Sequence, residues 1–294
     1  MIEVGWFGKI PSSKEYVSEQ ISGKLPLWLR NWVESGHEEF LSLFPERRGN
    51  IFKNLRFIIL DQQNNTCLVG ILTRSTDSIG RQFPATFFAQ VPINIFSDLT
   101  YLPVITGPIW RLLENTPPEE MEVVREQIED WQEQGQLGIL PRNKTYIDNL
   151  VESLTVGEFA RFCGISCFEN FNLLLNLKFS GKNRNDVPPL CIRGKLPGEK
   201  TLFFLCLWYL IIKKVFVSGY LPHCFLSGSE ADATEFTLFF RWPLKRDFLL
   251  LQGIDIENGY NIDLTKRLNN VHIQNNAVST TNLSAPFRAL LDSL

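Results

Sequence analysis

Apolar residues along this chain gather in short runs that predict β-strands. Residues 2–7 alternate apolar and polar positions, and residues 54–60, 67–72 and 83–91 are rich in β-branched and aromatic side chains, a composition typical of buried strands. The wholly polar turn at residues 61–65 joins two of these runs as a hairpin. Strand character also recurs at residues 172–179, 190–193, 202–212 and 234–240.

Amphipathic segments between these runs predict helices. The first helix is expected to begin near Pro26, since proline is tolerated in a first helical turn. Its apolar face carries Leu29, Trp32, Val33, Gly36 and Phe40 at helical spacing. Trp28 and Trp32 are interpreted as core residues in preference to a ligand-stacking role.

Two capping patterns predict further helices, and a last helix is expected in the tail. Thr116, followed by two prolines and Glu119, is expected to cap a helix with an apolar face at residues 121, 124, 128 and 131. Thr155 and Glu158 form a second capping box, which opens a short helix through Phe162. Residues 285–291 are expected to form the last helix, within an otherwise polar, asparagine-rich tail.

Composition narrows the class of protein. With 294 residues, 44% of them hydrophobic, the chain can bury a large core. Its 29 basic and 32 acidic residues give no net field that would attract nucleic acid or an anionic membrane. The N-terminus has no signal-peptide pattern, and the apolar run at residues 202–212 is too short to span a bilayer. We therefore expect a cytoplasmic protein without membrane insertion.

The six cysteines are expected to be buried thiols. In a cytoplasmic chain, cysteines inside apolar runs behave as small hydrophobic residues more often than as disulfides. Cys163 and Cys167 have the wrong spacing for a common zinc site, and no second pair of ligands lies near them in sequence. No metal and no cofactor are therefore predicted.

The most distinctive stretch is a polar loop, residues 74–81, between the apolar runs 67–72 and 83–91. Gly80 allows backbone conformations closed to other residues, and Pro84 stiffens the entry to the next strand. Two core strands therefore deliver a charged loop to one edge of a sheet, a common place for functional sites.

Two motifs carry a resemblance to a known family. Residues 75–84 read Ser-Thr-Asp-Ser-Ile-Gly-Arg-Gln-Phe-Pro, which resembles the Ser-x-Asp-x-x-Gly-Arg-x-Phe-Pro signature of the TagF (ImpM) family, accessory proteins of bacterial type VI secretion. Residues 5–11, Gly-Trp-Phe-Gly-Lys-Ile-Pro, are similar to the family's Gly-x-x-Gly-Lys-Leu-Pro opening. The family continues Gly-Asp-Phe-Val where this chain has Lys14, Glu15, Tyr16 and Val17, so the Gly-Asp pair is replaced.

The resemblance implies a fold and a function. It implies a three-layer α/β/α sandwich around a mixed β-sheet, which the alternation of strands and amphipathic helices independently allows. We expect a TagF-like α/β domain over residues 1–252 and a polar C-terminal extension over residues 253–294. The family suggests a non-enzymatic cytosolic regulator that acts post-translationally and negatively, by restraining assembly or firing. It would bind a protein of the secretion apparatus, with a forkhead-associated (FHA) scaffold protein as the candidate partner.

Charged and polar residues on two loops form the candidate site: Lys9, Glu15, Ser75, Asp77 and Arg81. They could form a partner-binding edge, with Arg81 offering its forked donors to a carboxylate or phosphate. Arg81 could instead pair with Asp77 or Glu15 and brace the loops. On the binding interpretation, Arg81→Glu is expected to abolish partner binding and to leave thermal stability nearly unchanged.

An enzymatic alternative stays open. The chain has no metalloprotease helix motif, nucleophile elbow, phosphate-binding loop or dinucleotide fingerprint, but catalytic triads can assemble from distant residues. The alternative is a small-molecule or phosphate-binding hydrolase that uses Glu15, Asp77 and Arg81.

Overall fold

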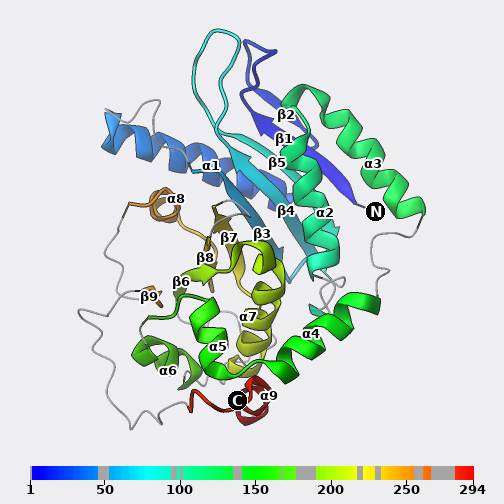
Figure 1. Ribbon diagram of the computed structural model, residues 1–294. Coiled ribbons are helices and arrows are strands. Elements are labelled where there is room, and N and C mark those ends of the chain that lie inside the picture. Colours follow the sequence, from blue (N-terminus) through cyan, green and yellow to red (C-terminus); the bar gives the residue numbers. More distant parts are fainter. Residues whose placement is uncertain are drawn as a thin grey trace.

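A computed structural model (Figure 1) describes residues 2–45, 53–93, 98–99, 102–134, 141–166, 168–176, 190–216, 221–228, 233–254, 261–265 and 282–294, without the side chains at 141–144, 169 and 176. Within these residues the strands form one nine-stranded sheet with the order β2-β1-β5-β4-β3-β7-β8-β6-β9. The strands are β1 (Glu3–Gly8), β2 (Val17–Glu19), β3 (Leu55–Asp61), β4 (Thr66–Thr73), β5 (Ala85–Pro92), β6 (Cys191–Leu196), β7 (His223–Ser227), β8 (Thr234–Phe239) and β9 (Asn261–Asp263).

The sheet is mixed. Its neighbouring strands run antiparallel except β6 and β9, which run parallel. The predicted hairpin is β3 and β4, with Asp61 opposite Thr66. The predicted α/β class with a mixed sheet is therefore confirmed.

Helices cover both faces of the sheet. One face packs against α1 (Lys24–Leu43) and α8 (Lys245–Leu251). The opposite face packs against a larger group: α2 (Leu102–Asn115), α3 (Met121–Glu133), α4 (Pro141–Ser153), α5 (Val156–Phe162), α6 (Phe168–Asn176), α7 (Thr201–Val215) and α9 (Phe287–Ser293). The three layers explain why the central strands read as continuous apolar runs, because both faces of each strand are buried.

Strand β3 illustrates this double burial. Phe57 and Ile59 belong to the core beneath α1 and α8, whereas Ile58 and Leu60 belong to the core beneath α2 and α7. Successive side chains of a strand point to opposite faces, so an apolar residue is needed at each position and no polar alternation is left.

Two predicted strands are helices. Residues 202–212 lie in α7, where ten of the fifteen residues are buried, among them Trp208 and Tyr209. A helix buried almost all round has no polar stripe, so its sequence does not differ from that of a buried strand by periodicity. Residues 172–176 lie in α6, and residues 177–179 are outside the described part.

The capping predictions have mixed outcomes. The box at α5 is confirmed, since the Glu158 amide donates to Thr155 Oγ1 and the Thr155 amide donates to the Glu158 carboxylate. Thr116 does not cap α3, as its hydroxyl donates backward to the Leu112 carbonyl at the end of α2. A separate 3₁₀ turn, Pro118–Glu120, precedes α3.

Residues after 252 contribute to the same sheet and core. Strand β9 pairs with β6, and Phe287, Leu290 and Leu291 of α9 are buried. The predicted division of the chain at residue 252 stays a prediction.

Two further expectations concern buried thiols and membrane spans. The five described cysteines are buried free thiols, as predicted, whereas Cys167 lies outside the described residues. Burial raises the pKa of the Cys67 and Cys224 thiols well above the usual range. Among the described helices, none is both long enough and apolar enough to cross a bilayer.

The contact between α1 and α8 generates a stability prediction. A Cβ atom at Gly36 would lie 2.6 Å from Cβ of Phe248, inside van der Waals contact. Gly36→Ala should therefore lower the free energy of unfolding by roughly 1–2 kcal/mol, because overpacking costs more than the roughly 1 kcal/mol gained in helix propensity. Urea unfolding measures the change.

Gly107→Ala in α2 is the matched control. Its Cβ would meet only the Leu202 Cδ1 methyl, at 3.0 Å. This variant should be neutral or more stable, and an equal loss in both variants would contradict the packing explanation.

Candidate functional site

The candidate site lies at the edge of the sheet where β1 and β4 end. The polar loop (residues 74–81) follows β4, and a first loop (residues 9–15) follows β1 (Figure 1). The two loops are tied together, because the Ser78 amide donates to the Ser13 carbonyl at 3.0 Å and the Arg81 guanidinium donates to the Lys14 carbonyl. Loops far apart in sequence therefore act as one unit.

The Asp77 carboxylate is the centre of this unit. Its side chain is fully buried and accepts four hydrogen bonds. Oδ1 accepts from the backbone amides of Ile79 (3.1 Å) and Arg81 (2.7 Å), and Oδ2 accepts from Lys9 Nζ (3.0 Å) and Arg81 Nε (2.6 Å). A buried carboxylate needs such compensation, and here all four positions around it are filled.

Hydrogen bonding decides the charge state of Asp77. Burial by itself would raise the pKa of the carboxyl group, but the hydrogen bonds from the Arg81 amide, Lys9, the Arg81 guanidinium and the Ile79 amide outweigh burial and hold the pKa well below its ordinary value. The carboxylate is therefore ionised at neutral pH and is a poor proton acceptor.

The backbone of the polar loop closes into a tight turn around Asp77. The Asp77 amide donates to the Arg81 carbonyl, and the Gly80 amide donates to the Asp77 carbonyl, each at 3.0 Å. Gly80 has φ of 82°, in the left-handed region that favours glycine. Ile79 is left at the tip with 58% of its surface exposed.

The five predicted site residues are only partly brought together. Lys9, Asp77 and Arg81 form one ionic cluster. Ser75 lies beside it and accepts from the Phe83 amide through its carbonyl. Glu15 is exposed, its amide bonds to Ser13 Oγ, and its carboxylate has no ion-pair partner among the described residues. The bracing pair is thus Arg81 with Asp77, so Arg81→Glu would disturb the loops as well as any docking.

An aromatic contact beneath the polar loop escaped sequence reasoning. Phe83 meets His37 of α1 at a ring-centroid distance of 4.9 Å and Tyr16 at 5.4 Å, both edge-on. Burial, with a smaller effect from the nearby Lys9 charge, lowers the pKa of His37 to about 4. His37 therefore packs as a neutral ring.

A cleft adjoins the loops. It has a volume of about 910 Å³, and Pro11, Ser75 and Thr76 contribute to its wall on the loop side. The start of β3 and the last turn of α2 also line it, and there Arg56 and Glu114 form a bidentate ion pair with distances of 2.6 and 2.7 Å. These residues share no sequence motif, so only the fold reveals the cleft.

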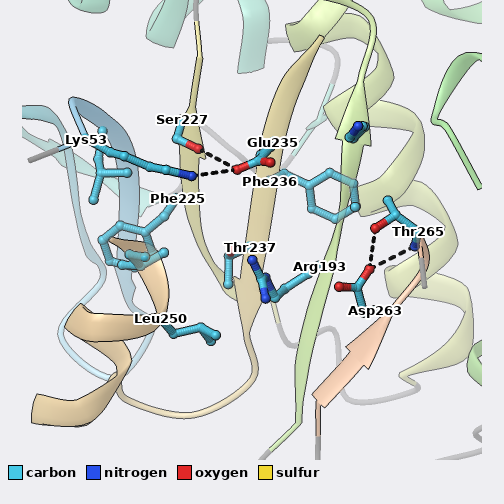
Figure 2. A pocket seen from close by; sticks show the side chains of 14 residues that line it. Lys53, Arg193, Phe225, Ser227, Glu235, Phe236, Thr237, Leu250, Asp263 and Thr265 are labelled. Carbon is cyan, nitrogen blue, oxygen red and sulfur yellow. Dashed lines mark hydrogen bonds and ion pairs between the residues drawn. The ribbon is translucent and has the colours of Figure 1, made fainter. Parts of the chain in front are cut away.

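A second, small pocket lies on β7, β8 and β6, with Lys53 at its rim (Figure 2). Its volume is about 40 Å³, little more than one water molecule requires. Glu235 accepts from Lys53 Nζ at 3.0 Å and from Ser227 Oγ at 3.3 Å, and Asp263 accepts from Thr265. Its polar groups bind one another, so the pocket offers little to a ligand.

Metal ligands do not cluster in the described parts of the chain. No three His, Cys, Asp or Glu side chains there lie close enough together to hold an ion.

Comparison with known proteins identifies the family that the N-terminal part of the chain matches. Residues 5–131 match the model of the TagF N-terminal domain, described as type VI secretion system-associated. The predicted family resemblance is thus confirmed for the part of the chain that contains both loops. This part of the chain therefore belongs to the TagF N-terminal domain family, which is described as type VI secretion system-associated.

Other comparisons add little. The chain is similar to PA0076 from Pseudomonas aeruginosa PAO1, a protein of known crystal structure, at 23% identity and a TM-score of 0.26. That match covers 31% of this chain and 44% of the other. No curated protein matches the chain.

The Asp77 cluster predicts a stability loss on amide substitution. Asp77→Asn removes the charge that holds Lys9 and Arg81 and places a donor among donors, so the melting temperature should fall by roughly 5–10 °C. Differential scanning fluorimetry measures it. Glu15→Gln makes the same chemical change at an exposed neighbour and should leave the melting temperature unchanged. Equal melting temperatures for Asp77→Asn and wild type would contradict the bracing role.

His37 predicts an acid-dependent loss of stability. In the unfolded chain His37 takes up a proton below about pH 6.5, whereas the folded protein does so only below about 4. Between these values unfolding binds a proton, so acidification lowers the free energy of unfolding, by up to roughly 3 kcal/mol. Asp77 adds to the acid-dependent loss only below about pH 5, because its stabilisation is lost as the pH falls from the ordinary carboxyl pKa toward the depressed pKa of the folded state.

The measurement is urea unfolding at several pH values for wild type and His37→Leu. The wild type should lose more stability than the variant between about pH 6.5 and 4. Parallel pH profiles for the two proteins would show that His37 does not titrate in this way.

Proposed function

We propose that this chain is a non-enzymatic cytosolic regulator of type VI secretion that acts by binding a protein of the apparatus at the edge formed by the two loops. The observation that supports the proposal is that the exposed side chain of Ile79 lies on a loop fixed by the buried Asp77 carboxylate. Four hydrogen bonds to Asp77 fix the polar loop, yet the loop leaves Ile79 58% exposed. A fixed apolar tip loses little conformational entropy on docking.

The charges around the tip support docking to a protein. The Arg81 side chain is 53% exposed although its Nε is bound to Asp77, so the guanidinium also presents a surface to solvent. Apolar and arginine side chains together are typical of the residues that dominate interface energy. The TagF resemblance suggests an FHA-domain scaffold protein as the partner and negative control of assembly or firing as the outcome.

The hydrolase alternative is less well supported. A general base needs a free lone pair and a pKa near the working pH, but Asp77 accepts four hydrogen bonds and has a depressed pKa. Glu15 is exposed and outside the ionic cluster. Both features favour a binding role for this edge over acid–base catalysis.

The test is a charge placed on the loop tip. Ile79→Asp should reduce recovery of the secretion component at least tenfold, because it puts a carboxylate into an apolar contact, and it should leave the melting temperature unchanged since the side chain is exposed. The measurement is affinity purification from the native cytosol with a C-terminal tag, with recovered proteins quantified by mass spectrometry.

Leu244→Asp is the matched control. Leu244 has the same exposed fraction, 58%, and precedes α8 on the other side of the molecule from the α2 layer. It should recover the partner as wild type does. Loss with Leu244→Asp alone would move the interface to the α8 side, and recovery of no secretion component by wild type would contradict the proposed function.

A further inference from the structure

The cleft beside the polar loop carries an excess of arginine. Arg56, Arg74 and Arg111 line it, against the single carboxylate of Glu114. Arg56 is engaged by that carboxylate and is only 12% exposed. Arg74 and Arg111 are exposed residues, and neither has an acidic partner within the described parts of the chain. We call this hollow the arginine cleft.

The walls of the arginine cleft are rigid. The Arg56 guanidinium on β3 donates to both carboxylate oxygens of Glu114 in the last turn of α2. The same guanidinium lies 5.8 Å from the ring centre of Trp110. The Arg74 amide donates to the Asn54 side chain at 3.1 Å, which fixes the backbone that carries Arg74. Arg74 and Arg111, which have no acidic partner among the described residues, are therefore carried by two fixed elements that both line the cleft, the start of the polar loop and α2.

The floor between the arginines is apolar. Ile71 of β4, Phe87 of β5 and Leu113 of α2 contribute to the lining. A volume of about 910 Å³ is at the upper end of the range for sites that hold small ligands, roughly 300–1,000 Å³. Separate positive groups at the rim and an apolar floor suit a segment that carries carboxylates at intervals with apolar side chains between them.

We propose that the arginine cleft binds an acidic, partly apolar peptide segment of a partner protein, with carboxylates on Arg74 and Arg111. This inference rests on the proposed function, because Pro11, Ser75 and Thr76 make the cleft continuous with the loop edge. A compact phosphate ligand suits it less well, because its free positive groups stand on two different elements, the start of the polar loop and α2, with an apolar floor between them.

The experiment uses an array of short overlapping peptides from the type VI secretion proteins of the same organism, probed with the full chain. Bound peptides are then titrated by fluorescence anisotropy. They should be acidic and bind more weakly at high salt. Arg74→Glu/Arg111→Glu should weaken binding about tenfold or more, since two charge-assisted contacts become repulsive.

A control matches the charge reversal elsewhere. Arg161→Glu/Arg246→Glu changes two exposed arginines on α5 and α8 and should keep the affinity within about twofold, because these charges are remote from the cleft. Equal weakening in both double variants, unchanged binding in the cleft variant, or no bound peptide would overturn the proposal. So would stabilisation of the chain by inorganic phosphate alone, which would indicate a phosphate site.

Affinity purification with the same variants separates this inference from the proposed function. A secretion component recovered equally by wild type and the cleft variant would leave the proposed function standing and refute the cleft as the contact. Acidic peptides bound in the cleft, with no secretion component recovered from the cytosol, would support the cleft and contradict the proposed function.

Discussion

A single buried carboxylate organises the functional edge of this protein. Asp77 accepts hydrogen bonds from its own loop and from Lys9, the residue directly after β1. The Arg81 guanidinium donates both to Asp77 and to the Lys14 carbonyl. These hydrogen bonds and ion pairs stabilise the loops only together, because removing one partner leaves a buried charge uncompensated. The exposed tip at Ile79 and the wall of the arginine cleft are both positioned by this set.

The sheet provides the base on which the clamp depends. Strands β1, β5 and β4 are adjacent, so the loops after β1 and β4 leave the same edge. Helices bury both faces of the central strands, which makes the edge the place where polar side chains can gather without entering the core. The contact between His37 and Phe83 connects the sheet layer to the loops, since the His37 ring on helix α1 packs against Phe83, which follows the polar loop.

The sequence predicted features that are local and missed those that depend on distant contacts. The polar loop, the capping box at Thr155 and the hairpin of β3 and β4 each lie within a short stretch with its own turn or cap residues. Residues 202–212 have the sequence pattern of a buried strand although they lie in helix α7, because burial on almost all sides leaves this helix without a polar stripe. The arginine cleft combines β3, the polar loop and α2, and no spacing along the chain relates Arg56, Arg74 and Arg111.

Native-state amide hydrogen exchange of the polar loop tests the central claim most directly. The amides of Ile79 and Arg81 donate to Asp77 Oδ1, so in wild type they should exchange far more slowly than in an unstructured peptide, although the loop is at the surface. In Asp77→Asn this protection should be largely lost, while the amides of β4 and β5 keep theirs. Unprotected Ile79 and Arg81 amides in wild type would show that no clamp exists, and the proposed binding edge would lose its basis.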